Sequence, residues 1–307
     1  MGKTKHRKIK ITIYIIIGIL ILFSVWEKYH PSNYTNTIIS PLANSIMSFS
    51  PIKQLVTGSN LSDIVDKELE GTKGTYGIVI KNLKTGESYS KNSHQYFQSG
   101  SLYKLWIMAT AVNQIEKGEL NQDEILSEEV SKLNELFNID SDQVELTEGE
   151  ITLSVKQAMN QMITISHNYA ALLLSEKVKL SNVRNFLGKN HLTESALGES
   201  PTVTANDIAL FFEELYNGQL ANKENTKLMI EILKQQALND KIPKYLSENL
   251  DIAHKTGEIG FFSHDAGIIF FKNGDYIIVI LSQSDLPPAA NERIANISHK
   301  VFEYFNK

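Results

Sequence analysis

Hydrophobic and polar residues change pattern twice between about residue 60 and the end of the chain. Residues 75–92, TYGIVIKNLKTGESYSKN, read as two strands around a turn with Gly86 at the reversal. From about 101 to 237, apolar residues recur mainly at helical spacing. Residues 252–283 are again strand-like, and Asn273-Gly274 is a strong hairpin signal within them. The pattern therefore predicts strands at both ends of a helical middle.

This order predicts an α/β fold of the α+β kind. An antiparallel sheet, formed by both ends of the domain, packs against helices, and an all-helical lobe is inserted in the middle. Residues 61–70 predict a first helix, and residues 287–305 predict a last helix with Ile294, Ile297 and Val301 on one face. We therefore expect one domain over residues 61–307.

The N-terminus has a different pattern, typical of a membrane signal. A basic stretch at 1–10 precedes the apolar run at 11–26, which predicts a transmembrane signal anchor. Residues 27–60 are interrupted by prolines and predict a spacer. The alternative is a cleaved signal peptide, but no small-x-small cleavage site closely follows the apolar run. An anchor would leave the basic segment in the cytoplasm and the domain outside.

Composition excludes several classes of site and partner. The chain of 307 residues has no cysteine, which removes disulfides, thiolate nucleophiles and cysteine-type zinc sites. The eight histidines form no metal motif, so we expect no metal and no cofactor. The formal net charge is −5 although the first ten residues are strongly basic, so the domain is acidic and a poor partner for nucleic acid.

Candidate chemistry starts with Ser101 and Lys104, which share one face at the start of an apolar predicted helix. Burial should lower the pKa of the lysine, and a neutral amine can take a proton from a nearby serine hydroxyl. The S-x-x-K pattern also occurs at 50–53 and 88–91, but only the copy at 101–104 opens a buried helix.

A second polar group interrupts an apolar helical stretch at Ser166-His167-Asn168. Ser166 could pass a proton to a leaving nitrogen, and Asn168 could hold a substrate carbonyl. By itself, Ser166 is more simply explained as a hydroxyl that is hydrogen-bonded within the core.

KTGE occurs twice, and the two copies have different settings. The copy at 84–87 lies at the predicted hairpin turn. The copy at 255–258 lies in a predicted central strand, where Lys255 could offer a fixed charge to an anionic substrate and Gly257 could let a ligand backbone approach. The alternative for Lys255 is a solvated lysine on a strand.

The ordered set S-x-x-K, S-x-N and K-T-G resembles that of the serine β-lactamase and penicillin-binding protein superfamily, from about residue 60 to 307. Class A β-lactamases are the most similar members. The resemblance implies Ser101 as the acylated nucleophile, Lys104 as the base and Ser166 as a proton shuttle. It also implies that Asn168 contacts the substrate amide. Lys255 and Thr256 would bind the substrate carboxylate, and the N–H groups of Ser101 and Glu258 would form the oxyanion hole.

Three positions depart from the class A pattern. His167 stands where the usual residue is Asp, and Ala266 stands where many class A enzymes have Arg, which should weaken carboxylate binding. The segment after Arg184 is short and lacks the family's deacylating Glu motif. Glu194 and Glu199 are nearby candidates for that base, but each is more simply a solvated loop residue. His254 and His264-Asp265 flank the K-T-G strand, either lining the cleft or serving a structural role.

The resemblance leaves three functions open. The first is a β-lactamase of the bacterial cell membrane that is acylated by β-lactams, hydrolyses their amide bond and is slow at deacylation. The second is a D,D-peptidase or penicillin-binding protein acting on acyl-D-Ala-D-Ala-type cell-wall peptides. The third is a non-catalytic β-lactam or wall-binding sensor.

Overall fold

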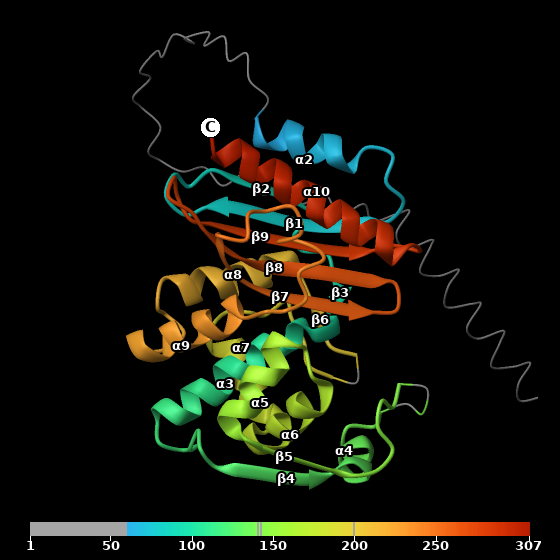
Figure 1. Cartoon of the computed structure of the whole chain (residues 1–307), viewed down its shortest axis with the longest axis vertical. Helices are drawn as coiled ribbons and strands as arrows, with labels where there is room; N and C mark the ends of the chain where they lie inside the picture. Colours follow the sequence, from blue (N-terminus) through green and yellow to red (C-terminus); the bar gives the residue numbers. More distant parts are fainter. Residues whose placement is uncertain (1–59, 140, 142, 199) are drawn as a thin grey trace, which may run out of the picture. The chain divides into compact units, whose positions relative to one another are not determined.

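The computed structural model describes residues 60–139, 141, 143–198 and 200–307. At its centre lies a five-stranded antiparallel sheet in the order β2-β1-β9-β8-β7 (Figure 1). The strands are β1 (Thr75–Asn82), β2 (Ser88–Lys91), β7 (Asp251–Ile259), β8 (Phe262–Phe270) and β9 (Tyr276–Gln283). Because β1 pairs with β9 along its whole length, the two ends of the domain form one sheet, and this prediction is confirmed.

Both predicted hairpin turns are present. The first KTGE lies in the turn between β1 and β2, where the Asn82 side chain accepts hydrogen bonds from the backbone N–H groups of Lys84 and Thr85. Gly86 has a φ of +77°, a value that glycine adopts at little cost. Gly274, between β8 and β9, has a φ of +143°. The reversals thus occur where short polar residues and glycine permit them.

One face of the sheet is covered by α2 (Leu61–Leu69) and α10 (Pro287–Phe305), the two predicted terminal helices. Asn60 caps α2, since its side chain accepts from the N–H of Asp63 and the Asp63 carboxylate accepts from the N–H of Asn60. The predicted apolar face of α10 is buried in a core cluster with the inner residues of α2 and one face of β1 and β9. These helices join the two ends of the domain.

The opposite face of the sheet carries the larger core, which continues into the helical lobe (Figure 1). The helices on this side are α3 (Lys104–Glu116), α4 (Val130–Leu136), α5 (Val155–Thr164), α6 (Asn168–Val178), α7 (Leu180–Lys189), α8 (Ala205–Tyr216) and α9 (Lys223–Lys234). Helix α8 packs on β1, β8 and β9, whereas α3 lies within the lobe against α5, α6 and α7. The lobe and the sheet therefore share one continuous apolar interior.

The lobe is not all-helical, which corrects one expectation. β4 (Ile125–Glu129) and β5 (Glu150–Ser154) form an antiparallel ribbon, and β3 (Phe97–Gln98) pairs with β6 (Thr202–Val203). In β4 only Leu126 is buried, so the strand has no regular alternation of apolar and polar residues. A ribbon on the lobe surface does not need that alternation, and the sequence pattern therefore gave no sign of it.

The predicted basic segment, anchor and spacer lie outside the described residues. Within residues 60–307, apart from the three positions left out, the structure contains no helix with the length and apolarity that a membrane span requires.

Candidate active site

The candidate nucleophile Ser101 lies on a tight turn that leads into a buried helix. It belongs to a 3₁₀ turn, η1 (Gly100–Tyr103), and α3 follows directly from Lys104. Gly100 has a φ of +48°, and a Cβ atom there would lie 2.5 Å from the backbone nitrogen of Glu258. Glycine at this position therefore allows the turn to pack directly on β7, the strand that carries K-T-G.

Lys104 begins α3 with its side chain fully buried. Its Nζ atom donates to the backbone oxygen of Ser166 (2.6 Å) and to Oδ1 of Asn168 (2.5 Å). Burial lowers the pKa of Lys104 to about 7, although the Glu145 carboxylate opposes the shift. A neutral amine has two N–H groups and one lone pair, so both hydrogen bonds persist when the lysine loses its charge. The lone pair is then available to accept a proton.

Ser166 lies in the short connection between α5 and α6, which the sequence suggested was one helical stretch. Its φ is +58°, an uncommon value for a residue with a side chain. The connection directs Oγ of Ser166 toward two lysines, at 3.0 Å from Nζ of Lys255 and 3.4 Å from Nζ of Lys104. Ser166 is therefore the hydroxyl that links the two lysines.

The prediction that the second KTGE lies in a central strand is wrong, because β7 is an edge strand of the five-stranded sheet. Lys255 projects from β7 and is nevertheless fully buried. Its Nζ atom donates to Oγ of Ser166 and to the backbone oxygen of Thr256 (2.8 Å). Burial, and then the charge of Lys104, lower the pKa of Lys255 well below its usual value. The solvated alternative is thus wrong for Lys255, and three predicted motifs that are far apart in sequence meet through Lys104, Ser166 and Lys255.

Asn168 begins α6 and uses both ends of its amide. Its oxygen accepts from Lys104, and its Nδ2 atom donates to a carboxylate oxygen of Glu145 (2.5 Å). Asn168 was predicted to contact the substrate amide, and in this structure its Nδ2 donor is engaged by Glu145. Sequence reasoning missed Glu145, since it lies in the polar segment before β5 and matches no motif.

The K-T-G strand contacts the nucleophile turn closely at Gly257. A Cβ atom there would lie 2.6 Å from the backbone oxygen of Ser99 and 3.0 Å from the Leu102 side chain. The backbone of β7 therefore lies against the segment that carries Ser101, as an oxyanion hole built from these two elements requires. Thr256 is buried and pairs across the sheet with Asp265.

The histidines beside the strand are structural. The Nε2–H of His264 donates to the backbone oxygen of Gln98 (2.7 Å), and its Nδ1 accepts from the N–H of Ser282 (3.1 Å). Burial lowers the pKa of His264 to about 4, so the ring is neutral. The buried His254 ring has Nδ1 2.9 Å from an Asp265 carboxylate oxygen. Both rings brace β7 and β8 instead of lining an open cleft.

His167, which departs from the usual Asp, has a local role. Its Nδ1 accepts a hydrogen bond from the backbone N–H of Ala170 (3.1 Å), so the imidazole caps the N-terminus of α6. An acceptor at this position satisfies one of the free N–H groups of the helix, and imidazole provides it in place of a carboxylate.

Of the two glutamates that were candidates for the deacylation base, Glu194 is described by the structure and contacts residues outside the predicted motifs. The Glu194 carboxylate contacts Nδ1 of His94 (2.7 Å) and the hydroxyl of Thr204 (2.9 Å), neither of which is a predicted site residue. Burial raises the pKa of Glu194, but these hydrogen bonds and the His94 charge outweigh burial and lower it. Glu199 lies outside the described residues.

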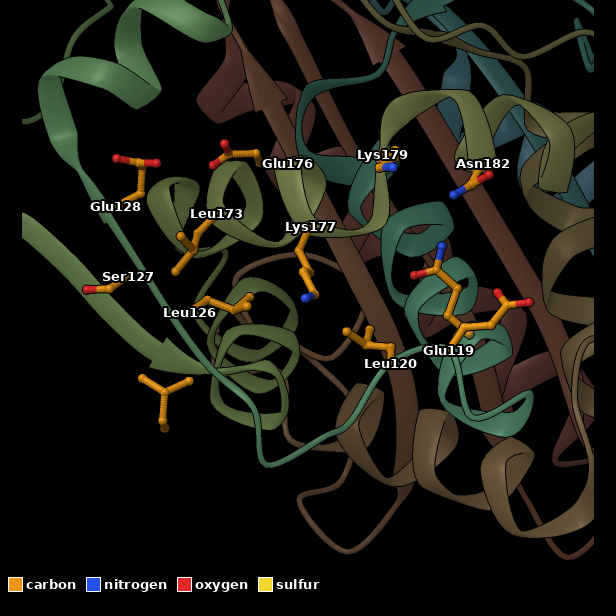
Figure 2. Close-up of a pocket in the computed structure, with 12 residues that line it drawn as sticks. Glu119, Leu120, Leu126, Ser127, Glu128, Leu173, Glu176, Lys177, Lys179 and Asn182 are labelled. Atoms are coloured by element: carbon orange, nitrogen blue, oxygen red, sulfur yellow. The ribbon is translucent and has the colours of Figure 1, made fainter.

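A separate cavity of about 650 Å³ lies in the helical lobe. Figure 2 shows the Lys177 side chain of α6 between Leu126 of β4 and Leu120, which lies in the connection after α3. None of its lining residues belongs to the predicted motifs, so this cavity is not the candidate active site.

Comparisons with known proteins agree with the motif geometry. The model of the beta-lactamase enzyme family matches residues 60–305. The chain is 24% identical over 249 residues to beta-lactamase CARB-4 of Pseudomonas aeruginosa, covering 75% of this chain and 85% of that protein.

Two solved structures share the fold at low identity. A beta-lactamase from Sphaerobacter thermophilus has a TM-score of 0.71 at 21% identity, covering 80% of this chain and 97% of that one. A PBP-A mutant, solved as an acyl-enzyme complex with penicillin G, has a TM-score of 0.69 at 21% identity, covering 80% and 96%. Because the family model spans most of the chain, this protein belongs to the beta-lactamase enzyme family.

Proposed function

We propose that this protein is a membrane-anchored, extracytoplasmic serine hydrolase of class A β-lactamase type that β-lactams acylate at Ser101. The observation that carries the proposal is the buried contact between Lys104, Ser166 and Lys255, one turn from Ser101. Ser101 provides a nucleophile, Lys104 a neutral amine, and Ser166 a hydroxyl that can relay protons. The names of the similar proteins support the proposal, because they describe a β-lactamase and an acyl-enzyme complex with penicillin.

In the proposed acylation step, each of these groups has a defined role. The Lys104 amine removes the proton from the Ser101 hydroxyl while the Ser101 oxygen bonds to the substrate carbonyl carbon. The backbone N–H groups of Ser101 and Glu258 stabilise the negative charge on the carbonyl oxygen. As the amide C–N bond breaks, Ser166 gives its proton to the leaving nitrogen and takes one from Lys104, which leaves an ester on Ser101.

Peptide mapping of the penicillin adduct tests this assignment. Full-length protein treated with benzylpenicillin should carry one penicilloyl group on the peptide containing Ser101, and Ser101→Ala should carry none. Ser88→Ala is the matched control, since Ser88 belongs to the S-x-x-K copy in the hairpin. Labelling at Ser88, or undiminished labelling of Ser101→Ala, would overturn the assignment.

A second candidate is a D,D-peptidase acting on acyl-D-Ala-D-Ala-type peptides, which needs the same acylation groups. The contacts of Glu194 favour this function. Glu194 lies in the shortened segment, and its carboxylate contacts His94 and Thr204, neither of which is a predicted site residue. Release of D-alanine from such a peptide, compared with hydrolysis of a β-lactam, discriminates between the two functions.

The anchoring part of the proposal rests on the apolar run at 11–26. Fractionation tests it: the full chain should stay with membranes after a carbonate wash, and a chain lacking residues 1–26 should not. Release of the full chain by the wash would contradict an uncleaved anchor.

A further inference from the structure

Glu145 is a carboxylate beside the candidate site that belongs to none of the predicted motifs. It lies in the segment before β5, and its carboxylate accepts a hydrogen bond from Nδ2 of Asn168 (2.5 Å). The oxygen of the same amide accepts from Nζ of Lys104 (2.5 Å). A single amide group therefore connects the carboxylate of Glu145 to the buried lysine.

The backbone next to Glu145 is held by two residues of the lobe. The hydroxyl of Tyr169, a buried residue of α6, accepts from the N–H of Leu146 (3.0 Å). Nδ2 of Asn134, in α4, donates to the oxygen of Leu146 (2.9 Å). The same Tyr169 hydroxyl donates to Oδ1 of Asn134 (2.9 Å), so the three residues form a closed set of contacts. The peptide after Glu145 is thus tied to α4 and to the first turn of α6, next to Asn168.

The two ends of the Asn168 amide are not interchangeable in these surroundings. A carboxylate only accepts hydrogen bonds, so it matches the Nδ2 end of the amide and repels the Oδ1 end. If the amide were turned over, Oδ1 would face the Glu145 carboxylate and the Nδ2 donors would face the amine of Lys104. Both contacts would then be unfavourable. Glu145 therefore favours the orientation in which Oδ1 of Asn168 holds Lys104.

This orientation leaves one donor of Asn168 for another partner. Nδ2 carries two hydrogens, and Glu145 accepts one of them. Asn168 is exposed whereas Lys104 is buried, so the amide lies between the buried amine and the solvent. The second hydrogen is available to a carbonyl group of the substrate, which is the contact predicted for Asn168.

We propose that Glu145 is a positioning residue that fixes the orientation of the Asn168 amide. In that orientation the amide oxygen holds Lys104, and the second hydrogen of Nδ2 meets the carbonyl of an acylamino group on the substrate. The inference rests on the proposed function and adds a residue to it. Glu145 acts here through Asn168 and contacts neither the substrate nor Ser101.

The charge of Glu145 gives the contact a second effect that can be measured. Burial lowers the pKa of Lys104 to about 7, and the Glu145 carboxylate opposes this shift. The other charged neighbour is Lys255 of β7, whose own pKa the charge of Lys104 lowers. Removal of the Glu145 charge should therefore lower the pKa of Lys104 further, so that the rise of the acylation rate with pH moves to lower pH.

The test compares acylation of the full-length protein by benzylpenicillin and by penicillanic acid, which has the same ring system without the acylamino group. At pH 9, where the Lys104 amine is neutral, Glu145→Ala should lower the second-order rate constant for benzylpenicillin about threefold to tenfold, the value of one hydrogen bond. The rate constant for penicillanic acid should change less than about twofold, because Lys104 keeps its contact with the backbone oxygen of Ser166. Glu148→Ala is the matched control, since it removes the same charge from the same exposed segment, and it should change neither rate.

Two conservative variants separate orientation from charge. Glu145→Gln removes the charge and can offer either end of its own amide to Asn168, so its pH midpoint should move to lower pH. Glu145→Asp keeps the charge on a shorter side chain, so its midpoint should stay close to that of the unchanged protein. Equal losses for the two penams in Glu145→Ala, no loss for either, or an unmoved midpoint in Glu145→Gln would overturn the proposal.

A measurement without substrate distinguishes this proposal from the proposed function. If neither penam acylates the protein, the proposed function fails, but the amide contact can still be observed. In ¹⁵N-labelled full-length protein in detergent micelles, the side-chain N–H signals of Asn168 are assigned with Asn168→Asp. One of the two proton signals should shift in Glu145→Gln, and neither should shift in Glu148→Ala. Unchanged Asn168 signals in Glu145→Gln would refute the role of Glu145.

Discussion

At the scale of single residues, the candidate site contains a lysine whose pKa burial lowers to about 7, so that the neutral amine becomes available near that pH. Lys104 is fully buried, and among the residues that the structure describes its hydrogen-bond acceptors are neutral oxygens of Ser166 and Asn168. These acceptors bind the amine in either protonation state, and burial favours the neutral one. Among the described residues, no carboxylate contacts the Lys104 amine, which lies three residues after Ser101 at the start of the same buried helix.

This arrangement predicts a pH dependence of acylation. The pKa of Lys104 lies at about 7, so the amine is protonated below that pH and free above it. The rate of acylation by a chromogenic β-lactam should rise about tenfold per pH unit below 7 and level off above about 8. Stopped-flow measurements between pH 5 and 9 check this, with Lys104→Arg as the variant that has no titratable base. A rate that is flat from pH 5 to 9 would contradict the role of Lys104 as base.

The two KTGE copies predict opposite mutational effects. Lys255→Ala removes a buried amine that contacts Ser166, and acylation should slow by about a hundredfold. Lys84→Ala changes a turn residue whose backbone N–H makes the turn's hydrogen bond, and should cost less than about 0.5 kcal/mol of stability. Acylation rates and thermal midpoints of both variants check the difference, which equal acylation defects would refute.

At the scale of elements, the site is formed where the η1 turn packs on β7 without an intervening side chain. Gly100 and Gly257 make this possible from the two sides, since a Cβ on Gly100 would lie 2.5 Å from the backbone nitrogen of Glu258, and a Cβ on Gly257 would lie 2.6 Å from the backbone oxygen of Ser99, directly before η1. In the proposed acylation step, the distance between these two backbones would set the geometry of the oxyanion hole. The two glycines, and not a polar side chain, therefore determine how closely the backbone of β7 approaches the turn that carries Ser101.

Gly100→Ala should widen that contact and impair acylation. The new Cβ would lie 2.5 Å from the nitrogen of Glu258, so β7 must move away from Ser101. Loss of one oxyanion donor typically costs about 10²–10³-fold in rate. Gly118→Ala is the matched control, because Gly118 also has a positive φ but no atom within 4 Å of the new Cβ. It should lower stability by about 1 kcal/mol and leave acylation unchanged, as rate and melting measurements would show.

At the scale of the whole molecule, the groups proposed for acylation, Lys104 and Ser166 of the lobe and Lys255 of the sheet, lie together. Glu194, in the segment between α7 and α8, instead contacts His94 and Thr204. General-base help to the attacking water is worth about 10²–10⁴-fold. We therefore expect the ester on Ser101 to form readily and to hydrolyse slowly.

A burst of β-lactam opening followed by a slow steady state is the expected result. The burst amplitude should equal the concentration of protein, and mass spectrometry should show the adduct throughout the slow phase. Glu194→Gln should not change the slow rate, since its carboxylate is bound to His94 and Thr204. Rapid turnover without an accumulated adduct would mean that a deacylating base acts in this site.

Much of this architecture could be predicted from local pattern. Gly86 and Asn273-Gly274 mark turns because short-range sterics determine them, and the apolar face of α10 follows from its own periodicity. The apolar helix after Ser101 also distinguished one of three S-x-x-K copies, and Lys104 of that copy contacts Ser166, which contacts Lys255.

The positions of Glu145 and Lys241 could not be predicted in this way. Both lie in polar segments without periodicity, and their surroundings are determined by residues distant in sequence: Asn168 for Glu145, and Glu258 with Asp265 for Lys241. A lysine with 1% exposure looks the same in the sequence as one on the surface. Such residues are recognised only when the tertiary contacts are known.

The pairing of β1 with β9 has a consequence for how the domain folds. Thr75 pairs with Gln283, so this central contact closes a loop of roughly 200 residues, which makes folding slow relative to fold classes with local contacts. At a synthesis rate of about 5–20 residues per second, β9 would be synthesised roughly 10–40 s after β1. Until then its backbone edge is open to other chains. A chain that stops before β9 cannot complete the sheet, however intact its catalytic motifs are.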